Sequence, residues 1–309
     1  MGFVKAGFEI VYANDFDKYA VQTYNANFDH KAVCADINHV DFNQLPIHDV
    51  LIGGFPCQPF SMMGMEQGFE DRRGKLFYRF EDVVNGQISQ GNKPKIIVLE
   101  NVNNLQKHDH GNTYKVIKTK LEEMGYRVFC QTLNSADYGV PQIRRRTFIV
   151  CFLDHSIEYE FPSKSELTMT LQDLLENDVE DKYFLSERIK KTILANGSGK
   201  YYAKSEVDLS IARPLTATMA KMHRANQDNY VTQNGKLRKL TPRECARLQG
   251  FDDDFVIPVS DSQAYKQFGN AVTVNVSFAV AKSILDALEN RNGKKIDRRN
   301  LFDLFPDGV

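Results

Sequence analysis

A cysteine held between two prolines is the feature of this chain whose residue types and spacing best fit chemistry. Residues 53–61 (GGFPCQPFS) place Pro56 directly before Cys57 and Pro59 two residues after it. Because proline fixes its own φ angle and removes an amide donor, the backbone around Cys57 is expected to be stiff. A thiolate on a stiff loop can act as a nucleophile, whereas a single cysteine in a turn is more often a half-buried thiol. The functional interpretation therefore depends on the side chains that accompany it.

An acidic residue and two arginines accompany the cysteine. Residues 96–100 (IIVLE) form an apolar run that ends in Glu100, which could cap the next helix or face a ligand crevice. Residues 142–146 (QIRRR) precede another apolar run, and in an extended strand Arg144 and Arg146 share one face. Two guanidinium groups on one face can hold a negatively charged or polar ligand, although a basic triplet is commonly a solvated surface.

These three segments resemble, in type and order, motifs of the C5-cytosine-specific DNA methyltransferases of bacterial restriction–modification systems. Other segments resemble further motifs of that family: residues 71–77, 134–142, 238–251 and 267–272. The resemblance runs nearly end to end and is weakest at residues 155–235. The resemblance is specific because several motifs follow one another in the family's order. The sequence Pro-Cys-Gln alone would be weak evidence.

The resemblance implies a role for each of four residues. Cys57 would add as a thiolate to C6 of a cytosine, and Glu100 would protonate or hydrogen-bond N3. Arg144 and Arg146 would hold the base oxygen and orient Glu100. C5 would then accept a methyl group from S-adenosylmethionine, with S-adenosylhomocysteine as product, and the covalent intermediate would divide one hard step into easier ones. The cytosine must leave the duplex to be reached, so the resemblance implies base flipping. It implies no metal ion.

Cofactor contacts follow from the same resemblance. In doubly wound folds an acid beyond a strand binds ribose hydroxyls, and Asp15 takes that place, with Phe16 stacking on the adenine. Asp36 and Ile37 fit the edge of the adenine. Taken singly, both aspartates would be interpreted as helix caps. Near the methionine moiety we expect Pro56, Asn270 and Val272.

DNA contacts are expected in the cysteine loop and in the less regular region after residue 154. The candidates are Ser61, Thr216 and Arg243, with the run at residues 221–224 beside them. Arg238, Lys239, Arg243 and Arg247 are expected to add a local basic face, with a solvated surface as an equal alternative. The region is short, which favours one recognition sequence in double-stranded DNA.

Strand–helix alternation in the first half predicts an α/β fold with a doubly wound, mostly parallel sheet. The resemblance makes this a Rossmann-like class I S-adenosylmethionine-dependent methyltransferase fold with a smaller, irregular target-recognition domain. We expect strands at residues 9–13, 31–35, 50–53, 96–100, 128–133 and 147–152, and helices at 16–28, 114–124 and 273–288. Residues 241–244 (TPRE) predict a capped helix start. The catalytic and cofactor domain is placed at residues 1–160 and 263–290, the target-recognition domain at 161–262, and a C-terminal tail at 291–309.

Composition agrees with a soluble enzyme, since 42% of the 309 residues are hydrophobic and 26% are charged. A formal net charge of −1 argues against a protein coated in positive charge but permits a local basic face. The five cysteines form no CxxC pair, which argues against a disulfide framework or a zinc site and favours a reducing cytosol. No apolar run reaches the length of about 20 residues that spans a bilayer. The family resemblance implies a monomer in the bacterial cytosol, bound to the nucleoid through DNA. A cognate restriction endonuclease is expected in the same system, with no direct contact implied.

The chain departs from the family pattern at its start. The family's glycine-rich cofactor turn should precede Asp15, and residues 1–8 match only the tail of that motif. Three explanations fit the missing turn. We favour a chain shortened at its N-terminus; the others are a circular permutation and a catalytically weak remnant. The permutation would draw on residues 300–309, where FDLF is followed by a glycine.

Two other functions remain open. A tRNA cytosine-5 methyltransferase would share the chemistry, but that branch commonly has threonine where Ser61 stands here, which favours DNA. A DNA-binding regulator that has lost cofactor binding would explain the missing turn. The retained Cys57, Glu100, Arg144 and Arg146 argue against it.

Overall fold

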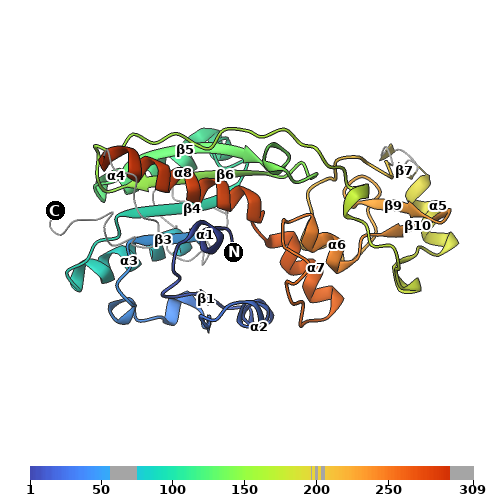
Figure 1. Ribbon diagram of the computed structural model, residues 1–309, viewed down its shortest axis with the longest axis horizontal. Coiled ribbons are helices and arrows are strands. Elements are labelled where there is room, and N and C mark those ends of the chain that lie inside the picture. Colours follow the sequence, from blue (N-terminus) through green and yellow to red (C-terminus); the bar gives the residue numbers. More distant parts are fainter. Residues whose placement is uncertain (56–74, 196, 199–200, 203–205, 293–309) are drawn as a thin grey trace.

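The structure is a computed structural model that describes residues 1–55, 75–195, 197–198, 201–202 and 206–292. Figure 1 shows two lobes along the longest axis, a larger one built on a β-sheet and a smaller one that carries β9, β10 and helices α5 to α7. Three expected site residues, Pro56, Cys57 and Ser61, lie outside the described residues, as does the segment at 300–309.

The larger lobe is organised by a four-stranded sheet in the order β3-β4-β6-β5. Its first pair, β3 with β4, is parallel, whereas β6 is antiparallel to both of its neighbours. The α/β class is as expected, but this sheet is mixed rather than mostly parallel. Only ten residues join β5 to β6, and a parallel pair needs a longer crossover, usually a helix. The strands are β3 (Val50–Gly54), β4 (Ile96–Val102), β5 (Arg127–Asn134) and β6 (Arg145–Phe152).

Both faces of this sheet are covered, because alternate side chains of β4 and β6 enter two different cores. Figure 1 shows α8 along one face of the sheet. One core contains Ile96, Val98, Phe148 and Val150, with Val280 and Ile284 of α8. The other contains Ile97, Leu99, Ile149 and Cys151, with Ile117 and Leu121 of α4. The covering helices are α3 (Lys75–Ser89), α4 (Asn112–Glu123) and α8 (Val274–Asn292).

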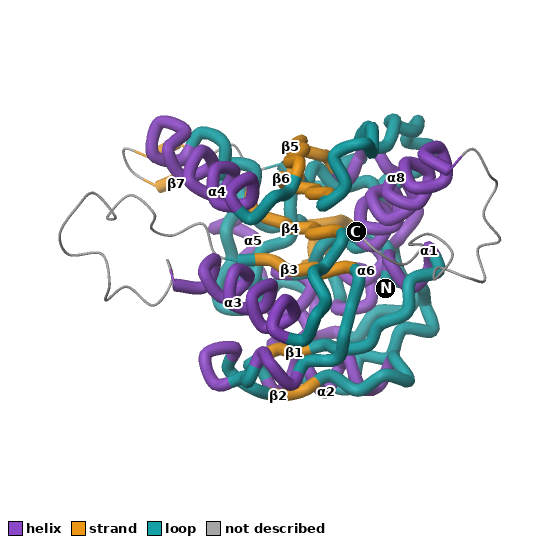
Figure 2. Tube along the Cα trace, turned by 90° about the vertical axis from the view of Figure 1, so that its left-hand side faces the viewer, coloured by secondary structure: helices purple, strands orange, loops and turns teal. Residues whose placement is uncertain are grey.

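The N-terminal segment forms a separate parallel pair, β1 with β2. Figure 2 shows β1 between β3 and β2, so the open edge of β1 lies on the side of β3. The strand expected at residues 9–13 is wrong, since the chain pairs only from Asn14. The elements are α1 (Gly2–Ala6), β1 (Asn14–Asp15), α2 (Lys18–Asn27) and β2 (Val33–Cys34).

The smaller lobe packs α6 and α7 against loops from both sides of the β9–β10 hairpin. The capped helix start is confirmed: Thr241 Oγ1 accepts from the Glu244 amide at 3.1 Å, and the Glu244 carboxylate accepts from the Thr241 amide at 2.8 Å. The expected domain boundary at residue 263 falls within α7, whose buried side chains join the core of the smaller lobe. The elements are α5 (Glu187–Leu194), β7 (Gly197–Ser198), β8 (Tyr201–Tyr202), β9 (Tyr230–Gln233), β10 (Lys236–Lys239), α6 (Pro242–Arg247) and α7 (Asp261–Asn270).

One helical stretch, residues 261–290, is long and apolar enough to cross a membrane by length and composition. Half of the most apolar 18-residue segment of this stretch is buried inside the protein. Since α8 contributes Val280 and Ile284 to the core beneath the sheet, packing within the larger lobe accounts for its composition.

Candidate active site

The ends of β3 and β4 bring Gly54 and Glu100 side by side. The two residues are partners in the parallel register. A Cβ atom added at Gly54 would lie 3.3 Å from Glu100 Oε2, closer than an ordinary van der Waals contact. The absence of a side chain at Gly54 therefore leaves the space in which the Glu100 carboxyl group lies, at the edge of the sheet where ligands of α/β folds bind.

The Glu100 carboxyl group is paired with Arg146. Arg146 Nε lies 3.0 Å from Glu100 Oε1, and each side chain is only 21% exposed. Burial raises the pKa of Glu100, and the charges of Arg146 and Arg144 oppose that rise without cancelling it. The site therefore holds, in a fixed orientation, a carboxyl group that keeps its proton to higher pH than an exposed glutamate.

Arg144 lies in a different environment from Arg146. Arg144 is 1% exposed, and its guanidinium donates to the carbonyl oxygens of Leu215 at 2.9 Å, Gly269 at 2.9 Å and Ala271 at 2.8 Å. Burial, with the neighbouring Arg146 charge, lowers the pKa of Arg144. Arg144 is buried and Arg146 is half-buried, whereas Arg145 between them is exposed. Arg144 and Arg146 differ in their partners, because Arg144 binds backbone of the smaller lobe and Arg146 binds Glu100.

Asn101 fixes the point from which the cysteine segment leaves the sheet. Its side chain is 3% exposed and donates to the carbonyl oxygen of Phe55 at 2.8 Å. Phe55 also packs edge-on against Phe77 and Phe80 of α3, with ring centroids 5.5 and 6.0 Å apart. Sequence reasoning did not single out Asn101; an amide directly after the acid at a strand end was the available signal.

Asp15, Phe16 and Asp36 lie at the carboxyl ends of the parallel β1–β2 pair. Phe16 directly follows β1 and is 79% exposed, which is unusual for a phenyl ring. Asp15 is exposed and accepts from the Asp17 amide at 2.8 Å. Asp36 is exposed and caps a short 3-10 turn at Ile37–His39. Asp36 thus makes the local cap that its position alone suggested, whereas helix α2 is capped by Asp17 and not by Asp15. The other described candidates are the half-buried Ile37 and Val272 and the exposed Asn270.

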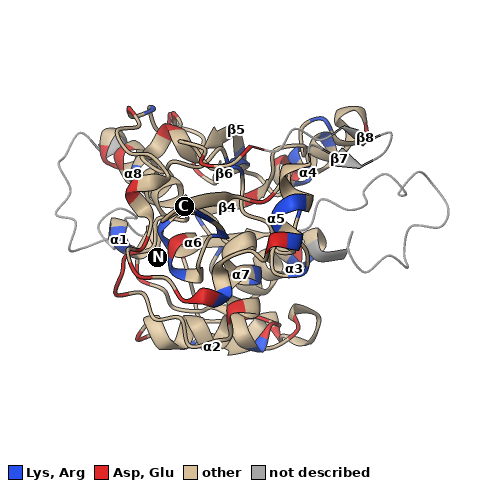
Figure 3. Ribbon diagram, turned by 90° about the vertical axis from the view of Figure 1, so that its right-hand side faces the viewer, with Lys and Arg blue, Asp and Glu red and all other residues tan. Residues whose placement is uncertain are grey.

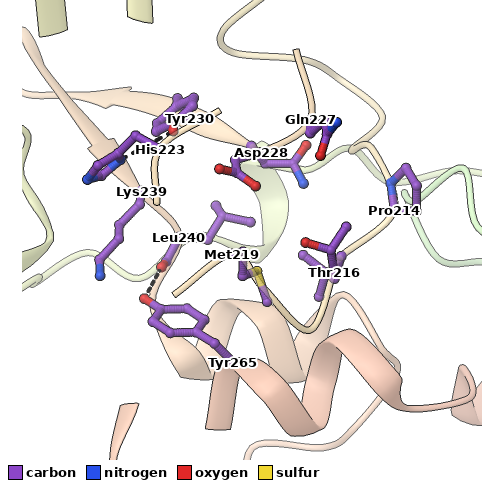
Figure 4. Close-up of a pocket in the computed structure, with 12 residues that line it drawn as sticks. Pro214, Thr216, Met219, His223, Gln227, Asp228, Tyr230, Lys239, Leu240 and Tyr265 are labelled. Carbon is purple, nitrogen blue, oxygen red and sulfur yellow. Dashed lines mark hydrogen bonds between the residues drawn. The ribbon is translucent and has the colours of Figure 1, made fainter. Parts of the chain in front are cut away.

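The expected DNA contact Thr216 lies at a pocket of the smaller lobe (Figure 4). The pocket is also lined by Met219, His223, Asp228, Lys239 and Tyr265. Thr216 Oγ1 accepts from Arg224 Nη2 at 2.9 Å. Arg243, the other described candidate, donates to the carbonyl oxygen of Phe255 at 2.7 Å and is half-buried.

The basic face expected from residues 238–247 is wrong. Arg238 and Glu244 are fully buried and form two hydrogen bonds of 2.8 and 2.7 Å. Arg247 pairs with Asp253 at 2.7 Å. Figure 3 shows acidic segments interspersed with basic ones over this end of the molecule. Glu244 neutralises the buried Arg238 and Asp253 neutralises Arg247, so two of the four basic residues are lost from the expected positive surface.

Comparisons with known proteins agree on one family. The model of the C-5 cytosine-specific DNA methylase family matches residues 1–286. Type II methyltransferase M.NlaX of Neisseria lactamica is 39% identical over 96% of this chain and 97% of its own length. Type II methyltransferase M.HhaI of Haemophilus parahaemolyticus is 38% identical over 91% of this chain and 89% of its own length. Among solved structures, the methyltransferase EhMeth of Entamoeba histolytica has a TM-score of 0.74 at 21% identity, covering 93% of this chain and 95% of its own. The Dnmt2 methyltransferase of S. pombe has a TM-score of 0.75 at 20% identity, and the match covers 93% of this chain and 94% of Dnmt2.

Proposed function

The chain belongs to the C-5 cytosine-specific DNA methylase family and is a DNA cytosine-5 methyltransferase with the class I methyltransferase fold, and on that premise we propose how it acts. Its substrate is a cytosine flipped out of one specific duplex sequence, and its methyl donor is S-adenosylmethionine. The reaction passes through a covalent bond between Cys57 and C6 of the base.

The Glu100–Arg146 pair is the observation that carries the proposal. Addition of a thiolate at C6 places negative charge on the ring, which is relieved if N3 takes a proton. Burial favours the protonated form of Glu100, so this carboxyl group can supply that proton or hydrogen bond. Arg146 keeps the group oriented, which spares the reaction the entropy of positioning it.

The position of Phe55 supports Cys57 as the nucleophile. Phe55 is held by Asn101 and by the aromatic rings of α3. Because Cys57 follows it by two residues, chain geometry keeps their Cα atoms within about 7 Å. In the reaction Cys57 forms a bond to C6, and Glu100 protonates N3. C5 then takes the methyl group, and S-adenosylhomocysteine is left as product. Water takes the C5 proton, the C6–S electron pair returns to Cys57, and N3 gives its proton back to Glu100.

The residues beyond β1 and β2 fit the cofactor. When bound, S-adenosylmethionine supplies an electrophilic methyl group. The exposed ring of Phe16 offers a face for stacking on the adenine. Asp15 binds the ribose hydroxyls, and Asp36 and Ile37 contact the edge of the adenine. Residues proposed near the methionine moiety are Pro56, Asn270 and Val272.

The smaller lobe is proposed as the part that reads the DNA, with the chain divided at residues 1–160 plus 263–290, 161–262 and 291–309. Ser61, Thr216 and Arg243 are the proposed DNA contacts. We propose that the enzyme acts as a monomer in the bacterial cytosol. Because its relatives are Type II methyltransferases, we further propose that it protects DNA from a cognate restriction endonuclease.

Expression in a bacterial host that lacks cytosine-5 methylation tests the function. Conversion sequencing of the host DNA should show methylation confined to one short motif, and none with Cys57→Ser. Methylation confined to tRNA would contradict the DNA substrate, and methylation that persists with Cys57→Ser would contradict the covalent mechanism.

A further inference from the structure

Arg144 joins three backbone segments that are far apart in sequence. Its Nη1 atom donates to the Leu215 carbonyl, and its Nη2 atom donates to the carbonyls of Gly269 and Ala271. Leu215 belongs to the smaller lobe, whereas Arg144 directly precedes the strand that carries Arg146. One side chain thus bridges the sheet of the larger lobe to the end of α7 and to the segment at Leu215.

Gln142 makes a second bridge to the same segment. Its Oε1 atom accepts from the Leu215 amide at 2.9 Å, and its Nε2 atom donates to the Leu248 carbonyl at 2.6 Å. Gln142 is fully buried. Both the amide and the carbonyl of Leu215 are therefore held by side chains that lie two residues apart, next to β6.

Gly269 lets this segment approach α7 closely. A Cβ atom added at Gly269 would lie 2.2 Å from the Ala217 amide nitrogen and 2.2 Å from the Thr216 carbonyl carbon. Both contacts are with backbone, which cannot yield as a flexible side chain can. The segment at residues 215–217 thus has one packed position, seated on α7 and tied to Arg144 and Gln142.

We propose that Arg144 is a positioning residue that fixes residues 215–217 relative to the Glu100–Arg146 pair, so that DNA read by the smaller lobe is aligned with the catalytic site. This rests on the proposed function, in which Thr216 contacts DNA. A buried guanidinium whose partners are neutral carbonyls is costly compared with an apolar side chain, and its best-attested use is to specify a single arrangement. The planar fork of arginine can serve several acceptors in fixed directions, which the point charge of lysine cannot.

Arg144→Lys tests the proposal, with Arg145→Lys as the matched control because Arg145 is exposed on the next position. Each purified variant is incubated with S-adenosylmethionine and a library of duplexes that holds the preferred site and all single-mismatch sites, and methylation is sequenced. Arg144→Lys should lower the ratio of preferred to mismatched methylation by about tenfold, whereas Arg145→Lys should leave it unchanged. Gly269→Ala, which keeps Arg144 but displaces residues 215–217, should lower the same ratio.

The outcomes separate this inference from the proposed function. A wild-type enzyme that methylates no duplex would refute the function itself. If the wild type is active and Arg144→Lys slows turnover while keeping the ratio, Arg144 acts on the flipped base, and the positioning role is wrong. An unchanged ratio in folded Gly269→Ala would also overturn it, and that variant decides the question if Arg144→Lys does not fold.

Discussion

Glu100 and Arg146 meet diagonally across the antiparallel pair of β4 and β6. The register sets Arg146 opposite Val102, two residues beyond Glu100, and the side chains close the distance to 3.0 Å between Nε and Oε1. Diagonal neighbours on one face are within reach of long side chains. The pairing of the strands therefore sets the orientation of the carboxyl group.

The pH dependence of the reaction should report the protonation of Glu100. Because the reaction uses the protonated carboxyl group, kcat/KM should fall as pH rises through the pKa of Glu100, which burial raises above its ordinary value. Glu100→Gln should lower kcat by about a hundredfold or more and abolish this alkaline decline. A profile of kcat/KM against pH for both proteins checks this. An alkaline decline that persists in Glu100→Gln would assign it to another group.

Removal of Arg146 should destabilise the protein more at high pH than at low pH. Without Arg146, Glu100 loses the larger of two charges that lower its pKa, so its folded pKa rises further. The folded state then holds a proton that the unfolded state has lost, and the free energy of unfolding falls as pH rises from the ordinary glutamate value through the folded pKa. We expect Arg146→Met to cost about 1–3 kcal/mol, with the larger loss at pH 8 than at pH 5.

Urea unfolding at the two pH values measures this difference. Arg145→Met is the control, because Arg145 is exposed and its loss should change stability by at most about 0.5 kcal/mol. Equal losses for Arg146→Met at pH 5 and pH 8 would show that its ion pair with Glu100 does not govern stability.

Gly54→Ala should impair turnover more than DNA binding. The new Cβ would lie 3.3 Å from Glu100 Oε2, so the carboxyl group must shift by a few tenths of an ångström. Displacement of a catalytic group on this scale should lower kcat by about tenfold, while KM for DNA stays within about twofold. Steady-state kinetics with a duplex substrate test this prediction. A larger effect on KM than on kcat would contradict the claim that Gly54 leaves room for the Glu100 carboxyl group.

Phe16→Ala should weaken cofactor binding without changing stability. The Phe16 ring is 79% exposed, so its removal exposes no core. Loss of base stacking costs about 1–3 kcal/mol, which corresponds to a Kd for S-adenosylmethionine raised by about 5- to 150-fold. Calorimetric titration measures this, with Ile47→Ala, also exposed at 59%, as the control. An unchanged Kd in Phe16→Ala would remove it from the cofactor site.

Local patterns in the sequence predicted much of this structure, and contacts distant in sequence were the part that they could not supply. The apolar run ending at Glu100 and the capping box at Thr241 depend on neighbouring residues, and both formed as expected. The antiparallel placement of β6 depends instead on how a ten-residue connection turns. Arg144 reaches carbonyls 71 to 127 residues away, and no periodicity indicates such partners. Burial of Arg238 likewise depends on Glu244 entering the same core.

Trapping of the covalent intermediate tests the central claim most directly. The protein is incubated with S-adenosylmethionine and duplexes containing 5-fluorocytosine, in which fluorine at C5 prevents the loss that would release Cys57. A denaturation-resistant protein–DNA adduct should form with the wild type and with Cys130→Ser, and none should form with Cys57→Ser. An adduct that forms equally well with Cys57→Ser would contradict the assignment of the nucleophile.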